Sequence, residues 1–167
     1  MPAITIKKIR LHAIALPQVE PLRTSFGQEP FKSAVLIEVV TEEGVVGWGE
    51  VSAEIKPGYS PETMGTALHI LQEFLVPMLI GKSLTSPSEV PGLLRSVRGH
   101  HLAKHGLEAA VWDALAKAYD IRLADLFASY LPDGHASRNA ATVGVSIGIQ
   151  PSIEATLAII HKRLDQG

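Results

Sequence analysis

Ser146 has the setting closest to a catalytic motif, because it lies in the middle of Gly-Val-Ser-Ile-Gly at residues 144–148. A hydrolase nucleophile elbow has this Gly-x-Ser-x-Gly pattern, with the serine on a sharp turn directly between a strand and a helix. Here a helical pattern cannot begin before Pro151, and only Glu154 and His161 follow as triad partners. We therefore interpret Ser146 as a small polar residue that faces the lumen of a β/α structure, with serine hydrolysis as the disfavoured alternative.

Three potential metal ligands, His101, His105 and Glu108, have a spacing that would put them on one face of a helix. The zinc signature His-Glu-x-x-His is incomplete, because no glutamate lies between the two histidines. The favoured alternative is that these side chains are solvated or cap a helix that begins after Gly99. The chain has no cysteine, which excludes disulfides, thiolate metal sites and a cysteine nucleophile.

A long loop is predicted at residues 18–30, which follow neither the helical nor the strand period and contain two prolines and a glycine. Loops of about a dozen residues in compact domains are usually functional or disordered. The segment from Arg23 to Gly27 combines a charge, two hydroxyls and an aromatic ring. The functional hypothesis is a mobile lid over a ligand, with Gly27 as a flexible point and Phe26 excluding water. An ordinary surface loop is the alternative.

The elements before and after this loop predict a three-stranded antiparallel meander. Alternating apolar residues indicate strands at residues 4–17, from Val35 and from Val46, and Glu-Glu-Gly at residues 42–44 forms a tight turn between the last two. Gly47 and Gly49 lie on one face of the third strand. We expect a neighbouring backbone to approach that face closely.

Helical periodicity then predicts three helices, at residues 60–79, 88–97 and 102–119. In the first, Ser60 is expected to be the cap and Pro61 the first helical residue. Asp113 on the third helix is expected to be an interhelical or capping partner rather than a catalyst. Residues 129–141 are rich in turn formers and predict a linker.

One β/α unit is predicted at the C-terminal end. Apolar residues alternate with small ones over residues 143–149, and neither face is charged, which is typical of a strand buried on both sides in a parallel sheet. Pro151 and Ser152 then open an amphipathic helix. A second strand does not follow before Gly167, so we interpret this unit as the first step of a larger parallel β/α structure that has been cut off.

The composition indicates a soluble globular protein, with 46% hydrophobic and 19% charged residues. A net charge of -2 gives no basic footprint for nucleic acid. No apolar run reaches the roughly 18 residues that would predict a membrane-spanning helix, and the N-terminus lacks the apolar segment of a signal peptide. We therefore expect a cytoplasmic protein with neither nucleic acid nor membrane as a partner.

Six segments, taken together and in order, resemble the enolase superfamily, in its mandelate racemase/muconate lactonizing enzyme group. The similarity is to the N-terminal portion of the o-succinylbenzoate synthase and N-acylamino-acid racemase branch. The segments are Pro-Leu-Arg-Thr-Ser-Phe-Gly (21–27), Gly-Val-Val-Gly-Trp-Gly-Glu (44–50), Pro-Gly-Tyr-Ser (57–60), Arg-Gly-His-His-Leu-Ala-Lys (98–104), Leu-Glu-Ala-Ala-Val-Trp-Asp (107–113) and Val-Gly-Val-Ser-Ile-Gly-Ile (143–149).

The resemblance implies an α+β capping domain at residues 1–135. Residues 136–167 would then be a linker and the first β/α unit of a truncated TIM-type barrel. In such enzymes a divalent metal, Mg²⁺ or Mn²⁺, and a pair of lysines act on a carbon next to the carboxylate of a small-molecule substrate. The intermediate is an enediolate, and its collapse gives either dehydration to o-succinylbenzoate, in menaquinone synthesis, or racemisation.

The resemblance also implies which part of the site this chain carries. The lysines and the metal ligands of the family would follow residue 167, so we expect no catalytic and no metal-ligating residue here, and this chain alone to be inactive. The expected substrate-binding residues are Leu22, Arg23, Thr24, Ser25, Phe26 and Gly27 of the lid, with Tyr59 and Ser146. The alternatives are a muconate cycloisomerase, a dipeptide epimerase, or a binding or assembly module without catalysis. A homo-oligomer is compatible with all of these.

Overall fold

The structure, a computed structural model, describes residues 2–25, 27–132 and 138–166. The chain forms two compact units. The large unit comprises Met1–Ile14 and Ser33–Arg138, and the small unit comprises Ala15–Lys32 and Asn139–Gly167. The loop near the N-terminus therefore groups with the C-terminal segment of the chain. We describe each unit by itself.

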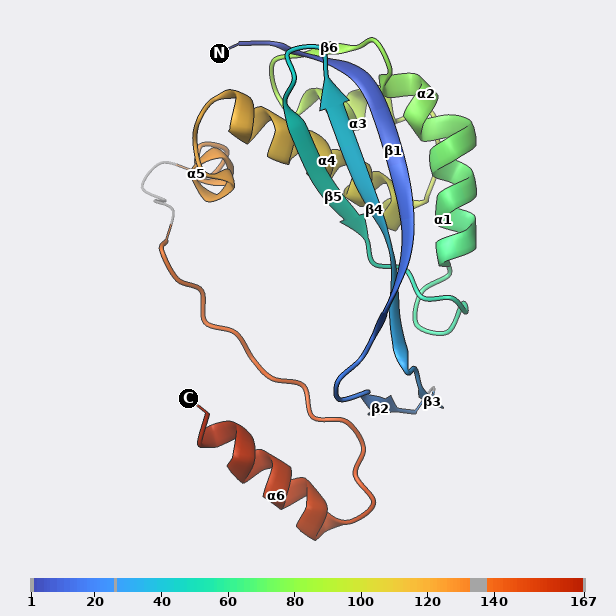
Figure 1. The fold of residues 1–167 in the computed structure, drawn as a ribbon, viewed down its shortest axis with the longest axis vertical. Helices are drawn as coiled ribbons and strands as arrows, with labels where there is room; N and C mark the ends of the chain where they lie inside the picture. The colour runs from blue at the N-terminus through green and yellow to red at the C-terminus, as the bar shows by residue number, and fades with distance from the viewer. Residues whose placement is uncertain (1, 26, 133–137, 167) are drawn as a thin grey trace. The chain divides into compact units, whose positions relative to one another are not determined.

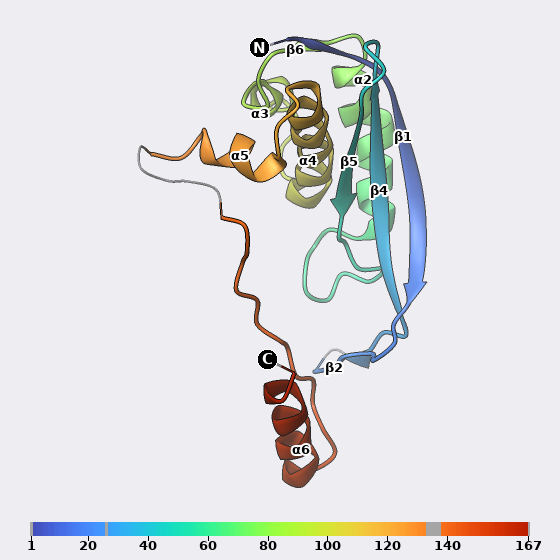
Figure 2. The ribbon, with the colours of Figure 1, turned by 60° about the vertical axis from the view of Figure 1, so that its left-hand side comes forward.

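The large unit contains a four-stranded sheet in the order β5-β4-β1-β6. Its strands are β1 (Ile4–Pro17), β4 (Phe31–Thr41), β5 (Val46–Val51) and β6 (Ser83–Leu84). β4 and β5 are antiparallel around the predicted turn, with Val35 opposite Val51 and Val40 opposite Val46. The predicted three-stranded meander is confirmed, and the short strand β6 is added to it, antiparallel to the start of β1. The helices of this unit cover one face of the sheet (Figures 1 and 2).

The first helical block is a continuous stretch that changes its hydrogen-bonding pattern twice. It consists of α1 (Met64–Ile70), the π-helical turn η1 (Leu71–Leu75) and α2 (Val76–Leu79). The prediction that Ser60 caps this block and Pro61 opens it is wrong. Thr63 is the cap, and its side chain accepts a hydrogen bond from the Thr66 N–H at 3.2 Å. The helix cannot begin earlier because Thr63 pairs with Glu54 as a β-bridge.

Three further helices follow, α3 (Glu89–Leu93), α4 (His101–Ala118) and α5 (Leu123–Ala128). α4 confirms the predicted third helix, whereas α3 is shorter than its predicted range of residues 88–97. α5 was not predicted, because its six residues cover less than two helical turns and give no readable periodicity. The predicted linker at residues 129–141 falls partly outside the described residues. Within the described ranges, every helix is too short or too polar to span a bilayer.

α4 packs directly on β5, and at two points, Gly47 and Gly49, the backbone of the strand contacts the backbone of the helix without an intervening side chain. A Cβ atom built on Gly47 would lie 2.2 Å from the Ala110 carbonyl oxygen. One built on Gly49 would lie 2.1 Å from the Gly106 carbonyl oxygen. Real Cβ atoms do not come this close to backbone, so both positions require glycine. The predicted close approach of a backbone to this face of the strand is confirmed.

Asp113 connects the same two elements through hydrogen bonds. Its Oδ2 accepts a hydrogen bond from the Trp48 N–H of β5 and another from Lys117 Nζ, both at 2.7 Å. Asp113 was expected to be an interhelical or capping partner, and it instead joins α4 to a strand.

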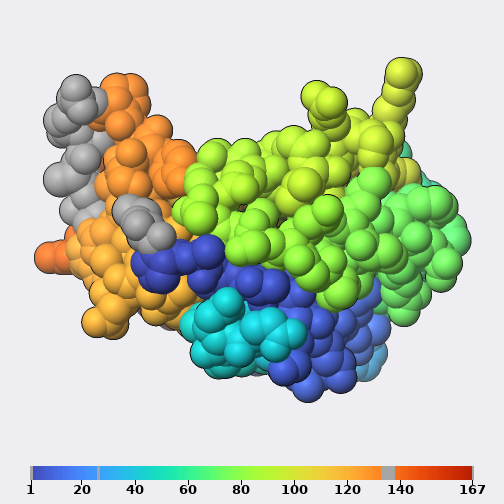
Figure 3. Space-filling model, turned by 90° about the horizontal axis from the view of Figure 1, so that it is seen from above, coloured from blue at the N-terminus to red at the C-terminus, as the bar shows by residue number. Residues whose placement is uncertain are grey.

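One apolar core lies between the sheet and the helices of the large unit. Its largest fully buried side chains include Ile4, Ile6, Ile37, Leu71, Leu75, Leu79, Leu107 and Leu115. Each contributes about 1.5–3 kcal/mol by leaving water. At one end of the sheet the turn between β4 and β5 lies against the start of β1 (Figure 3). There the Thr5 N–H donates to the Glu43 carboxylate at 3.0 Å, which joins the turn to β1.

The small unit contains a hairpin and one helix. The hairpin is formed by β2 (Arg23–Thr24) and β3 (Gly27–Gln28), so part of the predicted loop is regular. The helix is α6 (Ile153–Leu164). Ser152 caps it, since its Oγ accepts a hydrogen bond from the Ala155 N–H at 3.2 Å. The predicted helix start is confirmed.

Residues 143–149 do not form the predicted strand. They run as an extended segment (Figure 1) and belong to neither sheet of the described chain. Their apolar side chains are exposed, from 38% at Ile147 to 83% at Val143. A strand in a parallel sheet is paired with neighbouring strands. Among the described residues this segment is paired with no strand of either sheet and has one backbone hydrogen bond to the loop, from the Ile149 N–H to the Arg23 carbonyl, so the prediction of a strand buried on both sides is wrong for this chain. A lumen-facing Ser146 depends on such neighbours and stays a prediction.

Candidate functional site

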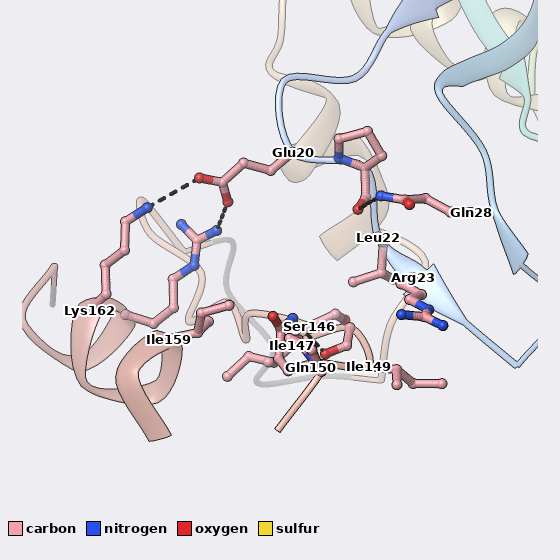
Figure 4. Close-up of a pocket in the computed structure, with 14 residues that line it drawn as sticks. Glu20, Leu22, Arg23, Gln28, Ser146, Ile147, Ile149, Gln150, Ile159 and Lys162 are labelled. Atoms are coloured by element: carbon pink, nitrogen blue, oxygen red, sulfur yellow. Dashed lines mark hydrogen bonds and ion pairs between the residues drawn. The ribbon is translucent and has the colours of Figure 1, made fainter. Parts of the chain in front are cut away.

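The small unit contains a pocket of about 380 Å³. The loop that carries the β2–β3 hairpin forms one wall, and α6 with the segment before it forms the other (Figure 4). The lining residues are Glu20, Pro21, Leu22, Arg23, Gln28, Ser146, Ile147, Gly148, Ile149, Gln150, Pro151, Ile159, Lys162 and Arg163. Small-molecule sites are typically concave and of roughly 300–1,000 Å³, with apolar walls and a few polar groups. This pocket falls within that range of volume, but half of its fourteen lining residues are charged or polar.

Backbone contacts hold the two walls together at Arg23. The Arg23 carbonyl accepts a hydrogen bond from the Ile149 N–H at 2.8 Å. Next to it, Gly148 approaches the loop so closely that a Cβ atom would lie 2.8 Å from the Arg23 nitrogen and 2.9 Å from its carbonyl oxygen. Gly148 is therefore needed for the contact between the walls, a role that its place in the Gly-x-Ser-x-Gly pattern did not indicate.

An ion-pair cluster closes one end of the pocket. The Glu20 carboxylate accepts hydrogen bonds from Lys162 Nζ at 3.2 Å and from Arg163 Nη2, both in the last turn of α6 (Figure 4). The hydrogen bond and charge of Lys162, with the charge of Arg163, lower the pKa of Glu20 below its ordinary value. Glu20 is thus a carboxylate that stays ionised next to two cations.

Three of the predicted site residues are brought together. Leu22 and Arg23 of the loop and Ser146 of the C-terminal segment all line the pocket, although more than a hundred residues separate them in the sequence. Ser146 lies in the extended segment, away from the start of α6 at Ile153. It therefore lacks the strand–turn–helix setting of a nucleophile elbow.

The remaining predicted residues lie elsewhere. Thr24, Ser25 and Gly27 are at the hairpin tip, where Thr24 Oγ1 donates to the Gly27 carbonyl at 3.1 Å, and they are not among the described lining residues. Phe26 lies outside the described residues. Tyr59 belongs to the large unit, in the loop between β5 and α1, and is 84% exposed.

The sequence did not reveal several lining residues. Glu20, Gln28, Lys162 and Arg163 contribute polar groups to the pocket, and none of them lies in a motif. Glu20 and Arg163 are 143 residues apart. A periodic pattern or a local spacing therefore carries no signal for their pairing.

The histidines of α4 do not form a metal site. Glu108 accepts a hydrogen bond from Trp112 Nε1 at 3.3 Å instead. No group of three His, Asp or Glu side chains suited to a metal ion occurs among residues 2–25, 27–132 and 138–166. The structure therefore does not bring His101, His105 and Glu108 together as a set of three ligands.

The chain is similar to known proteins over nearly its whole length. The chain is 39% identical over 165 residues to an o-succinylbenzoate synthase from Geobacillus kaustophilus. It is 33% identical over 159 residues to an N-succinylamino acid racemase from Amycolatopsis sp. A solved structure of an enolase superfamily member from Listeria innocua superposes with a TM-score of 0.88, at 36% identity and over 98% of this chain.

The antiparallel sheet with helices on one face matches the N-terminal capping domain of the enolase superfamily. Residues 8–128 match the N-terminal domain of mandelate racemase / muconate lactonizing enzyme. The chain belongs to this family, and over nearly its whole length it is similar to the N-terminal part of the o-succinylbenzoate synthase and the N-succinylamino acid racemase. The resemblance predicted from the six segments is confirmed.

The chain spans less than half the length of these relatives. The matched region covers 99% of this chain but 42% of the Geobacillus protein. The corresponding figures are 95% and 41% for the Amycolatopsis protein. The Listeria structure is likewise matched over 42% of its chain.

Proposed function

We propose that this chain is the substrate-recognising part of an enzyme that removes a proton from a carbon next to a carboxylate. The reaction would be o-succinylbenzoate synthesis by dehydration, N-acylamino-acid racemisation, or both. The observation that carries the proposal is the pocket, because Leu22 and Arg23 of the loop meet Ser146 there. The names of the Geobacillus and Amycolatopsis relatives support this pair of reactions.

In this proposal the chain binds and orients the substrate. The Arg23 guanidinium supplies positive charge for a carboxylate oxygen, since guanidinium–carboxylate hydrogen bonds are among the strongest in proteins. Leu22 and Ile147 supply apolar walls, and Ser146 supplies a hydroxyl. Thr24, Ser25, Phe26 and Gly27 form the tip of the lid, and Tyr59 is assigned to the same substrate site. Closure of the lid would keep water from a reactive intermediate.

The proposal assigns the metal to another part of the protein. In the family a bound divalent ion, Mg²⁺ or Mn²⁺, stabilises the enediolate when it is present. The described residues of this chain include no three His, Asp or Glu side chains that could hold such an ion, so they do not fit a metal site. The proposal assigns no catalytic step to this chain and expects it to be inactive alone.

The organisation of the protein follows from the same proposal. Residues 1–135 are assigned to the capping domain, and residues 136–167 to the linker and the first β/α unit of a TIM-type barrel. We assign the complete enzyme to the cytoplasm, with a small-molecule carboxylate as its ligand and neither nucleic acid nor membrane as a partner. A homo-oligomer is compatible with these assignments.

A second candidate is a cycloisomerase. The chain is 30% identical over 130 residues to a chloromuconate cycloisomerase from Pseudomonas putida. That similarity is lower and shorter than the 39% over 165 residues to the o-succinylbenzoate synthase, which favours the first proposal. A dipeptide epimerase and a binding module remain alternatives that substrate tests separate.

The test uses the protein in its natural length. With Mg²⁺ present, formation of o-succinylbenzoate is followed by absorbance and racemisation of N-succinylamino acids by polarimetry. Turnover of at least one substrate is expected. Turnover of muconate or of a dipeptide in place of both would support the alternatives, and turnover of none would support the binding module. Activity of the 167-residue chain alone would contradict the assignment of the catalytic groups to another part.

A further inference from the structure

Glu20 occupies a distinctive position at the base of the loop. It lies three residues before β2, where the chain leaves β1 and enters the hairpin. Its carboxylate contacts Lys162 and Arg163 on α6, 142 and 143 residues away in sequence. One carboxylate therefore links the base of the loop to the last turn of the helix on the other wall.

The two cations depend on this carboxylate to different degrees. Lys162 is 56% exposed and can be hydrated, whereas Arg163 is 30% exposed. Arg163 Nη1 donates to Gln166 Oε1 at 3.1 Å, Nη2 donates to Glu20, and Nε is buried without a partner. Without Glu20, the guanidinium would lose an ionised acceptor while part of it is already shielded from water. Arg163 is thus the cation that would be left less well hydrated by the loss of Glu20.

The contacts lie at the base of the loop and not at its tip. Beyond Glu20, the Arg23 carbonyl accepts the Ile149 N–H, which is the second attachment to the other wall. At the far end of the hairpin, Thr24 Oγ1 donates to the Gly27 carbonyl, whereas the two attachments to the other wall both lie at or before Arg23.

We propose that Glu20 is a positioning residue that acts as an ionic latch. The latch is defined as Glu20 with Lys162 and Arg163, and it holds the base of the loop on α6 so that Leu22 and Arg23 face Ser146. The role of the loop as a lid over substrate rests on the proposed function, whereas the latch itself does not.

The latch is tested by amide hydrogen exchange in the 167-residue chain. Glu20→Gln keeps the size of the side chain and removes its charge. We expect roughly threefold faster exchange at the Ile149 N–H, the magnitude that loss of an exposed ion pair allows. Glu29→Gln is the matched control, because Glu29 lies in the same loop and makes no ion pair in the described part of the chain. Equal exchange in the two variants would overturn the latch.

A charge exchange distinguishes the latch from a general effect of the substitution. The triple variant Glu20→Lys, Lys162→Glu, Arg163→Glu restores opposite charges across the contact. We expect slow exchange at Ile149 to return in this variant, and continued fast exchange would overturn the proposal. In the wild-type chain, exchange at the Ile149 N–H should be faster at molar salt than at low salt, since screening weakens exposed ion pairs. Equal exchange rates at the two salt concentrations would also overturn the proposal.

A kinetic measurement in the natural-length enzyme connects the latch to the lid. Glu20→Gln is expected to raise KM several-fold and to change kcat little, because Glu20 holds the loop and does not touch the reacting atoms. A kcat loss at unchanged KM would overturn the positioning role. If the natural-length protein turns over none of the substrates, the proposed function fails, while the exchange experiment still decides on the latch.

Discussion

Gly49 of β5 and Gly106 of α4 lie against each other with no side chain between them. A Cβ atom built on Gly49 would lie 2.1 Å from the Gly106 carbonyl oxygen, and one built on Gly106 would lie 2.9 Å from the Glu50 carbonyl oxygen. At Gly49 the nearest obstacles are backbone atoms, which cannot turn away as a flexible side chain can, whereas at Gly106 the nearest is the Val51 side chain, with Cγ2 at 2.6 Å. This pair of glycines therefore determines how closely the longest helix lies on the sheet.

The substitution Gly49→Ala should push α4 away from β5 and open the core between them. We expect the free energy of unfolding to fall by about 1–3 kcal/mol, the usual cost of inserting a methyl group into a close-packed site. Urea unfolding followed by circular dichroism measures it. Gly92→Ala in α3 is the control, since a Cβ atom added there would meet no neighbouring atom within 4 Å and alanine favours a helix. Equal stability of the two variants would contradict the argument.

Glu62 caps α4 from another part of the chain. It is 9% exposed, and its carboxylate accepts the N–H groups of Leu102 at 2.9 Å and Ala103 at 3.2 Å. The first amides of a helix lack partners within the helix and favour negative charge. Glu62→Ala should lower the free energy of unfolding by about 2 kcal/mol, because it leaves two donors unpaired. Glu62→Gln should cost less, since one acceptor oxygen remains.

Thermal unfolding measures both Glu62 variants. The control is Glu73→Ala, which removes an exposed carboxylate from the helical block. A stability loss in Glu73→Ala as large as that in Glu62→Ala would show that loss of negative charge alone explains the effect.

The sequence predicted the fold well where the spacing of residues along a strand or helix matched what close packing requires of the same residues. Gly47 and Gly49 alternate along β5 and predicted a close neighbour, and α4 with its small residues is that neighbour. Leu22, Arg23 and Ser146 were expected in one site from the family resemblance, and they line one pocket.

The missed features depend on interactions that leave no local pattern. Thr63 caps α1 in place of Ser60 because a β-bridge to Glu54 delays the helix. The pairing of Glu20 with Arg163 joins distant residues, which a single sequence cannot reveal. Residues 143–149 carry the pattern of a buried strand, but pattern alone forms no strand without neighbouring strands.

The turn before α3 should make stability depend on pH through Glu89. Its Oε1 accepts the N–H groups of Thr85 and Ser86, each at 2.8 Å. These bonds, chiefly the one from Thr85, lower the pKa of Glu89 below its ordinary value of 4.5. Because the folded pKa is the lower one, the ionised carboxylate contributes stability above the unfolded value, and this contribution is lost as pH falls through the folded value.

Glu89→Gln tests this dependence. The variant should be less stable than the wild-type chain at neutral pH, and the difference should shrink as the pH falls through the folded pKa of Glu89, because the protonated carboxyl loses this contribution. Urea unfolding of both proteins over a series of pH values from neutral to acid measures the difference. A difference that stays constant or grows as the pH falls would mean that the ionised carboxylate contributes nothing here.

Gly148 should be the position at which a single methyl group disturbs the pocket most. A Cβ atom added to it would lie 2.8 Å from the Arg23 nitrogen and 2.9 Å from Leu22 Cδ1. Gly148→Ala should therefore displace the base of the loop and weaken the hydrogen bond from the Ile149 N–H to Arg23. We expect faster exchange at that amide and, in the natural-length enzyme, a KM raised about tenfold, since displacements of about 1 Å are costly at such sites.

Gly144→Ala is the matched control, because it adds the same methyl group to the same segment at a position with no neighbouring atom within 4 Å. If the two variants behave alike, the close approach of Gly148 to Arg23 does not position the loop.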